Sequence, residues 1–176
     1  MKNINIRKVK SEDAEQFIKL RNMVWRITYK DIFPEEVFLE KEARAEQEIK
    51  EFNQNFYNDN QVIAYVAVDD GRIVGLLWGK RNSEYEYFNN LGYADLMAMY
   101  IHPDYQGKGI GGQFKQKFIN WAKENGAQKY VIGVLKDNKP ARIVYEAWGG
   151  KLSKHTQPFV KIGVGYEEVF YTYDLK

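Results

Sequence analysis

The segment Gln106–Gly112 has the composition of an anion-binding turn. It reads Gln-Gly-Lys-Gly-Ile-Gly-Gly and lies between an apolar run and a stretch of helical periodicity. The N-terminus of a helix leaves backbone N–H groups unpaired and carries partial positive charge, and glycines let a phosphate approach that backbone closely. The segment therefore predicts a phosphate or pyrophosphate cradle, to which Lys108 and Lys115 could add charge. Four glycines within six residues argue against a turn that needs glycine only for its dihedral angles.

Two other phosphate-binding motifs fit the segment less well. Gly107, Gly109 and Gly112 satisfy G-x-G-x-x-G, a spacing that is weak evidence by itself. In a dinucleotide fold the first glycine follows the strand directly, and an acidic residue stands about 20 positions further on. Here residues 102–107 separate the strand from the glycine turn, and the residue 20 positions after Gly112 is the apolar Ile132. A P-loop is excluded, because no Lys-Ser or Lys-Thr stands at the required spacing.

Two motifs, in this order, resemble those of the GNAT superfamily of N-acetyltransferases. The first is Gln106-Gly107-Lys108-Gly109-Ile110-Gly111, which resembles Q/R-x-x-G-x-G/A and follows the strand-like run Leu96–Pro103. The second comprises Asn138, Ala141, Tyr145-Glu146 and Gly149, which resemble N-x-x-A-x-x-x-Y-E-x-x-G. The resemblance is strong over residues 94–150 and looser over the rest of the chain.

The resemblance implies that acetyl-CoA is the co-substrate and assigns residues to it. The pyrophosphate would be held by backbone N–H groups of Gln106, Gly107, Lys108, Gly109, Ile110, Gly111 and Gly112. Met99, Tyr100 and Ile101 would offer the backbone of a splayed strand to the pantetheine arm, and Asn138 would contact the pantetheine or the thiol end. An open strand edge can pair with the amides of that arm as it would with an added strand.

The implied reaction is direct attack of an amine on the thioester in a ternary complex. It needs a general base for the amine, a donor for the oxyanion and an acid for the leaving thiolate. The resemblance assigns the acid to Tyr145, and Ile101 N–H is our candidate donor. Alternatively, Tyr145 is a helix-face aromatic residue that packs on the sheet.

The general base is expected to be Asp95, which stands where many relatives carry glutamate. Asp is shorter than Glu, so the proton would pass through a water, and Asp95 could equally be a strand-end cap or a surface carboxylate. Glu84 and Glu86 are rival candidates for the base. His102 precedes Pro103 and is expected to lie in a turn, and His155 is expected at the surface. Because Asp95 stands where many relatives carry glutamate, a non-catalytic acyl-CoA sensor on the same fold is the alternative function.

The acceptor side is predicted around Trp25 and Tyr29, which share one face of a helix. Their rings could form a cation–π wall for an amine, or they could pack in the core. Glu35, Glu36 and Glu40 nearby would favour a cationic acceptor, unless they form a solvated face. We expect a small-molecule or peptide amine as the acceptor.

Hydrophobic periodicity predicts the elements that must position these residues. Strands are expected at residues 3–10, 62–68, 73–79, 94–101, 130–135 and 164–175, and helices after Ser11, after Phe33, from 110 to 126 and from 137 to 147. Residues 82–92 have no clear pattern. These elements predict an α/β (α+β) domain of three layers. The resemblance adds a GNAT-like α/β/α arrangement whose mixed, largely antiparallel sheet is splayed at the cofactor site.

Composition limits the remaining possibilities. With 176 residues, 1–176 is expected to form a single domain. The net charge of +2 gives no reason to expect nucleic acid as a partner. No apolar run could span a membrane and no signal peptide is evident, so a cytoplasmic location is expected. The absence of cysteine and the presence of only two histidines predict no metal site and no cysteine acyl-enzyme. The final strand could pair across a homodimer, although nothing in the sequence requires it.

Overall fold

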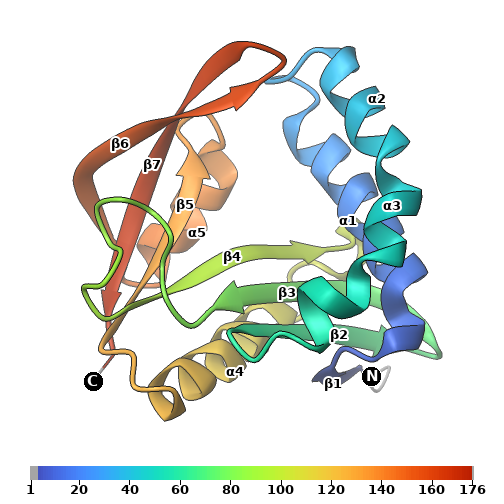
Figure 1. Cartoon of the computed structure of the whole chain (residues 1–176), viewed down its shortest axis with the longest axis horizontal. Helices are drawn as coiled ribbons and strands as arrows, with labels where there is room; N and C mark the ends of the chain where they lie inside the picture. Colours follow the sequence, from blue (N-terminus) through green and yellow to red (C-terminus); the bar gives the residue numbers. More distant parts are fainter. Residues whose placement is uncertain (1–3, 176) are drawn as a thin grey trace.

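The computed structural model describes residues 4–175, which form a seven-stranded mixed sheet in the order β1-β2-β3-β4-β5-β7-β6 (Figure 1). Every neighbouring pair is antiparallel except β4 and β5, which are parallel. The strands are β1 (Asn5–Lys8), β2 (Val62–Asp69), β3 (Arg72–Lys80), β4 (Tyr93–Ile101), β5 (Lys129–Leu135), β6 (Lys151–Lys161) and β7 (Val164–Asp174).

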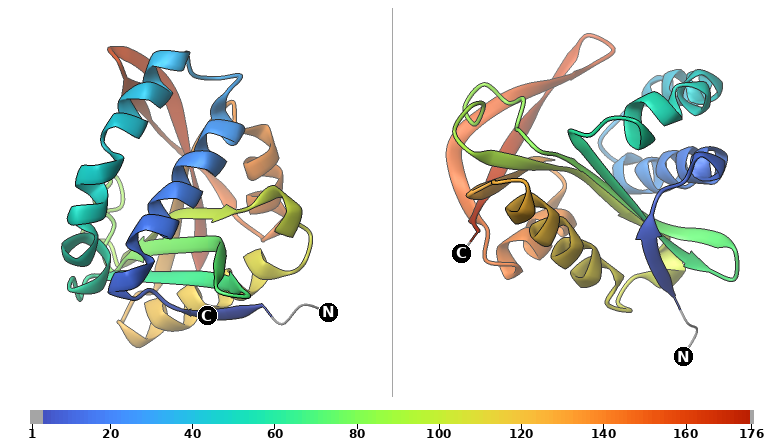
Figure 2. Two further views of the ribbon diagram at one scale, coloured as in Figure 1. Left: turned by 90° about the vertical axis from the view of Figure 1, so that its right-hand side faces the viewer. Right: turned by 60° about the horizontal axis from the view of Figure 1, so that its bottom comes forward.

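Helices cover both faces of the sheet, which confirms the three-layer α/β architecture (Figure 2). One face carries α1 (Ala14–Tyr29), α2 (Glu35–Ala43) and α3 (Ala45–Lys50), and the other carries α4 (Ile110–Glu124) and α5 (Lys139–Ala147). Short helical turns lie at Ser11–Asp13, Asn53–Tyr57 and Pro103–Tyr105. No helix among residues 4–175 combines the length and the hydropathy that a membrane span requires.

Local sequence signals explain several of these boundaries. Phe17, Ile18, Leu20 and Val24 lie on one stripe of α1 and are buried against the sheet, as an amphipathic helix requires. The β2–β3 hairpin turns at Asp70-Gly71, where both residues have positive φ (47° and 75°), as in the two-residue turn that this dipeptide predicts.

The β4–β5 junction is the feature that creates the site. Only three residue pairs join the two strands: Tyr93 with Lys129, Ala94 with Tyr130, and Asp95 with Val131. Beyond these pairs the strands diverge, so the sheet is splayed as expected. The register of β4 against β3 also shifts between Trp78 and Lys80. Such an irregularity changes which face the following side chains occupy.

The register shift is visible in the core. Before it, Ala94 and Leu96 pack into the cluster under α4, and after it Met99 and Ile101 pack there instead. Tyr100 consequently faces α1 and the cluster around Trp25. The bulge therefore changes which β4 side chains face α4, from the even-numbered residues before it to the odd-numbered residues after it.

One strand, β6, was not expected from the sequence. Its residues are mostly polar, and Pro158 argues against a strand inside a sheet. The structure places β6 at the sheet edge, paired only with β7, where a proline can be accommodated. The strand forms the outer half of a long hairpin that extends toward α2 (Figure 1).

Candidate active site

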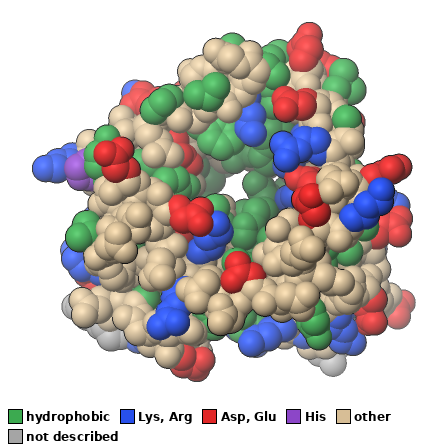
Figure 3. All heavy atoms as spheres, viewed as in Figure 1, with side chains coloured by type: hydrophobic (Ala, Val, Ile, Leu, Met, Phe, Trp, Pro, Cys, Tyr) green, Lys and Arg blue, Asp and Glu red, His purple; other side chains and the backbone are tan. Residues whose placement is uncertain are grey.

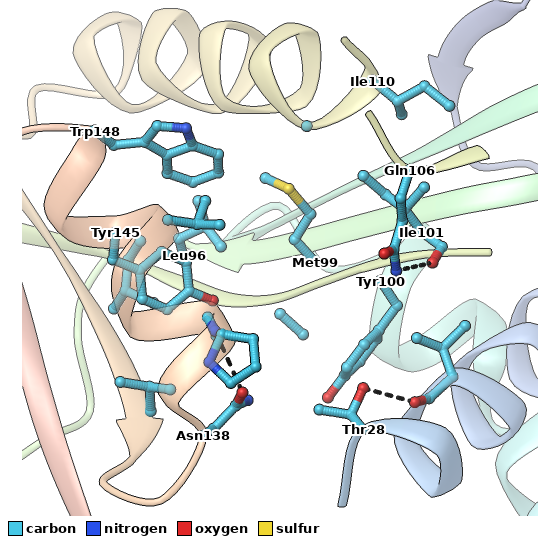
Figure 4. Close-up of a pocket in the computed structure, with 18 of the residues that line it drawn as sticks. Thr28, Leu96, Met99, Tyr100, Ile101, Gln106, Ile110, Asn138, Tyr145 and Trp148 are labelled. Carbon is cyan, nitrogen blue, oxygen red and sulfur yellow. Dashed lines mark hydrogen bonds between the residues drawn. The ribbon is translucent and has the colours of Figure 1, made fainter. Parts of the chain in front are cut away.

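A cavity of about 610 Å³ occupies the splay between β4 and β5. Its walls come from β4, β5, the start of α4, α5 and the last turns of α1 (Figure 4). The volume is typical of a small-molecule or cofactor site. Figure 3 shows an opening through the middle of the molecule, bounded mainly by hydrophobic side chains, at the place where β4, β5 and α1 surround the splay. The splay can thus be approached from two sides.

The glycine-rich segment forms the start of α4 at one end of this cavity. Gly109 is the N-cap residue with φ of 80°, and Gly107 has φ of 71°, both in the left-handed region that favours glycine. No side chain within residues 4–175 caps this helix end, so its first N–H groups point outward with the positive end of the helix dipole. Gln106 Nε2 donates to Ile101 O at 3.2 Å and ties the turn to the end of β4 (Figure 4).

Most of the residues assigned to the pyrophosphate line the cavity: Gln106, Gly107, Gly109, Ile110, Gly111 and Gly112. Lys108 does not line the cavity, and its ammonium lies 4.7 Å from the ring of Tyr105, which does. Lys115, one turn into α4, lies 4.9 Å from the ring of Trp148 on the cavity wall. Partial burial lowers the pKa of Lys115.

The strand residues assigned to the pantetheine arm also line the cavity. Met99, Tyr100 and Ile101 follow the point at which the ladder between β4 and β5 ends. That edge of β4 faces the splay rather than another strand, so an extended polar ligand could pair with its backbone. Their placement agrees with a ligand that runs from the α4 turn along β4.

The second motif forms the start of α5. Asn138 is buried and caps the helix, with Oδ1 accepting from Ala141 N at 3.3 Å. Two turns later, Tyr145 presents its ring to the cavity beside Trp148 (Figure 4). Burial, with a smaller effect of Tyr29, raises the pKa of Tyr145. The phenol is therefore protonated at neutral pH and can donate a hydrogen bond.

Trp25 and Tyr29 occupy different positions relative to the cavity. Tyr29 lines the cavity, whereas Trp25 is 7% exposed and lies behind it, with its ring 5.1 Å from those of both Tyr29 and Phe33. The cation nearest the Trp25 ring is Lys41, at 5.1 Å. Trp25 thus supports the wall from the core, and Tyr29 is the one of the pair that faces the splay.

Asp95 is 1% exposed and lies behind the cavity wall, on the strand pairs that close the splay. Its Oδ2 accepts from Ser83 Oγ at 3.2 Å, and its Oδ1 has no hydrogen-bond partner among the described residues. Burial raises the pKa of Asp95 to about 7, and the negative charges of Glu168 and Glu84 add to this, against Ser83 and Lys80. A carboxylate with this pKa is suited to accept protons near neutral pH.

The other candidate bases lie elsewhere. Glu84 is exposed and pairs with Lys80 at 2.8 Å, and Glu86 is exposed. His102 is the N-cap residue of the turn at Pro103–Tyr105. His155 stacks on Tyr87 with ring centroids 4.2 Å apart.

Glu168 on β7 is a buried carboxylate that the sequence analysis did not single out. It is 7% exposed, and it accepts from Tyr85 OH at 3.3 Å and from Gln157 Nε2 at 2.8 Å. A Cβ atom at Gly133 would lie 2.6 Å from Glu168 Oε1 and 2.5 Å from Tyr85 OH. Because Gly133 lines the cavity, the carboxylate and the phenol lie directly against its wall. Strand alternation, which puts Glu168 on the face of Tyr166 and Phe170, was the available signal.

Comparisons with known proteins agree with this geometry. PaiA N-acetyltransferase from Thermoplasma acidophilum, solved in complex with coenzyme A, superposes with a TM-score of 0.72 over 97% of this chain and 99% of its own, at 21% identity. At this identity the likeness shows the fold.

Curated relatives match over shorter stretches. The uncharacterized N-acetyltransferase YobR of Bacillus subtilis (strain 168) is 34% identical over 65 residues, which are 36% of this chain and 26% of YobR. The L-amino acid N-acyltransferase MnaT of Escherichia coli (strain K12) is 31% identical over 52 residues, 30% of each chain. The matches thus span less than a third of the length of either relative.

The family assignment rests on a match that covers most of the chain. The model of the acetyltransferase (GNAT) family matches residues 19–149, which include the α4 turn, the splayed half of β4 and the whole of α5. These are the elements that build the cavity. The chain belongs to the GNAT family of acetyltransferases.

Proposed function

We propose that the protein transfers the acetyl group of acetyl-CoA to a primary amine by direct attack in a ternary complex. The observation that carries the proposal is the continuity of one cavity from the N-terminus of α4, along the open edge of β4, to the Tyr145 ring. A diphosphate fits the N-terminus of α4, an arm that carries amides fits the open edge of β4, and a thioester fits the region beside the Tyr145 ring. The relatives' names, and the coenzyme A bound to PaiA, support the same reading.

The residues divide the chemistry as follows. The amine loses a proton to Asp95, through a water because Asp95 lies behind the wall, and its nitrogen attacks the thioester carbonyl. A backbone N–H on the open edge of β4 near the Tyr145 ring stabilises the oxyanion. Ile101, the candidate from the sequence, lies beside Gln106 at the other end of the cavity (Figure 4). The C–S bond then breaks, and Tyr145 donates a proton to the departing sulfur. The products are an amide and free CoA thiol.

The first experiment measures CoA release with a thiol reagent across a panel of amines. The chain has no cysteine, so the protein adds no background signal. Changing Tyr145 to Phe should lower kcat at least about tenfold, because general acid–base groups contribute about 10²–10⁴-fold, while the Kd for acetyl-CoA stays the same. Changing the exposed Tyr57 to Phe is the control and should leave kcat as it is.

Initial rates with both substrates varied should give intersecting lines, as expected for a ternary complex. Parallel lines would contradict direct attack. Thermal stabilisation by acetyl-CoA without CoA release for any amine would support the alternative function, a non-catalytic acyl-CoA sensor. The position of Asp95 behind the wall is the observation that favours this alternative.

A further inference from the structure

Two buried carboxylates lie near the splay without a cation beside them. Asp95 is 1% exposed and Glu168 is 7% exposed, and neither forms an ion pair within 4.0 Å in the part of the chain that the structure describes. Removing a carboxylate from water is costly unless a counter-charge is close. Buried carboxylates with perturbed pKa values occur preferentially at functional sites. A cation from outside the chain would compensate them.

The two carboxylates are connected through the loop before β4. Tyr85 OH donates to Glu168, Tyr85 N donates to Ser83 Oγ at 3.3 Å, and Ser83 Oγ donates to Asp95. Gln157 on β6 holds Glu168 from the other side. Donors thus fix the Glu168 carboxylate against the bare Cα of Gly133.

Glu168 lies against the β5 wall of the cavity, on the face of the sheet opposite α4. Ile132 and Val134, which flank Gly133, pack into the cluster under α4 together with Tyr145. Gly133 itself alternates to the other face, where Glu168 and Tyr85 lie. Because Gly133 has no side chain, nothing from that position separates these polar groups from the cavity. The Glu168 charge also raises the pKa of Tyr29 on the cavity wall, an effect secondary to burial.

We propose that Glu168 binds the ammonium group of the acceptor and thereby selects amines that are cations at neutral pH. This inference rests on the proposed function and specifies its acceptor. Glu168 is then the binding residue for the amine, Tyr85 and Gln157 position its carboxylate, and Asp95 takes the proton. The Glu168 carboxylate accepts from Tyr85 OH and Gln157 Nε2, which are both neutral donors, so a compact ammonium group would add a charged donor and the counter-charge that the carboxylate lacks.

The proposal has a second consequence, for the pH dependence of the reaction. The groups that act on Asp95 are Lys80 on β3, Glu84 and Ser83 in the preceding loop, and Glu168 on β7; Tyr85 is coupled to it as well. The negative charge of Glu168 raises the pKa of Asp95. Removing that charge should therefore move the acidic limb of the kcat/KM profile to lower pH. This shift tests the electrostatic coupling of the two carboxylates, and the KM for the amine tests the binding of the ammonium group.

The kinetic test compares Glu168→Gln with Glu167→Gln, using an amine that gives turnover with the wild-type protein. Glu167 is the next residue on β7 but is exposed and pairs with Lys136 at 2.7 Å. In Glu168→Gln we expect the KM for the amine to rise at least about tenfold, as for loss of a charged hydrogen bond. The KM for acetyl-CoA should be retained, and Tm should not fall, because burial raises the pKa of Glu168. Glu168→Asp should recover part of the loss. An unchanged amine KM, or an equal rise in Glu167→Gln, would overturn the proposal.

A binding test separates this proposal from the proposed function. Protein loaded with CoA is titrated with n-butylamine, and with n-butanol as the neutral isostere, at pH 7.0. We expect the amine to bind more tightly than the alcohol to wild-type protein and to Glu167→Gln, and this preference to disappear in Glu168→Gln. If no amine releases CoA but the preference is seen, the proposed function fails and the cation site stands. If CoA is released but Glu168→Gln keeps the preference, the cation site fails alone.

Discussion

At the scale of single residues, Asp95 shows how burial creates a base. In water an aspartate is too weak a base to take protons near neutral pH, but burial raises the pKa of Asp95 to about 7. The same burial should make the residue costly for the fold. Activity and stability are therefore expected to respond to it in opposite directions.

We expect Asp95→Asn to lower kcat at least about tenfold, as for loss of a general base, and to raise Tm at alkaline pH. The sign follows from linkage. A raised carboxyl pKa in the folded state means that the stability present below pH 4 is lost as pH rises through about 7. Asn carries no charge at either pH, so the Tm of Asp95→Asn should exceed the wild-type Tm at pH 8 and equal it at pH 4. Each kcal/mol is worth roughly 2–4 °C at this chain length.

Thermal melts at the two pH values and CoA release at pH 8 check this prediction, and the exposed Asp31→Asn variant is the control. Equal melting temperatures at pH 8 would show that the carboxylate is better solvated than its burial implies. Full activity in Asp95→Asn would remove Asp95 from the mechanism.

The residue scale also separates what the sequence could predict from what it could not. The position of Asp95 was conspicuous, because a charge inside an apolar run stood in register with a known motif, but its burial was not predictable, since a surface carboxylate was equally expected. For Glu168 the sequence offers only strand alternation with Tyr166 and Phe170, a weak signal beside the adjacent Glu167, and the pairing of β7 with β5 and β6 shows that Glu168 faces inward. Trp25 and Tyr29 share a helix face in the sequence, yet Trp25 is buried in the core and Tyr29 is the one that lines the cavity.

At the scale of elements, most boundaries were predictable because local chemistry defines them. Asp70-Gly71 defines a hairpin, and the glycine turn defines the start of α4. β6 was not predictable, because its stability comes from pairing with β7 rather than from its own hydrophobic pattern. Its connection to β7 passes through Ile162 at φ of 43°, a conformation that a β-branched residue rarely adopts.

The α4 turn allows a matched pair of glycine substitutions. Gly109→Ala should destabilise the protein by about 1–2 kcal/mol, because alanine is strained at φ of 80°. Gly112→Ala should be neutral or stabilise it by about 0.5–1 kcal/mol, because this position is helical and nothing lies within 4 Å of the added Cβ. Urea unfolding of both variants measures the difference. A loss of equal size in both would mean that space, rather than backbone conformation, demands glycine in the turn.

At the scale of the whole molecule, the cavity is bounded by segments from both halves of the sheet. A ligand that contacts β4, α4 and α5 together should therefore stabilise the fold as a unit. At about 100 times its Kd, acetyl-CoA should add about 2.7 kcal/mol to the free energy of unfolding. Thermal shift measures this, and NAD serves as the control ligand that should produce no shift.

Hydrogen exchange should localise the same effect. Added acetyl-CoA is expected to slow exchange of the amides at the start of α4 and along the splayed end of β4, but not in α3, no residue of which lines the cavity. Protection confined to α3 would contradict the assignment of the cavity.

The three residue pairs between β4 and β5 also have a mechanical meaning. On one side of these pairs β1–β4 form an antiparallel part of the sheet, and on the other side β5–β7 form a second antiparallel part. Within the sheet, the two parts are joined by this short junction. Under mechanical force or on heating, the two parts should separate first at this junction, because few hydrogen bonds must break there. Such an opening motion would widen the splay without unfolding either part of the sheet, and would allow a bulky product to leave.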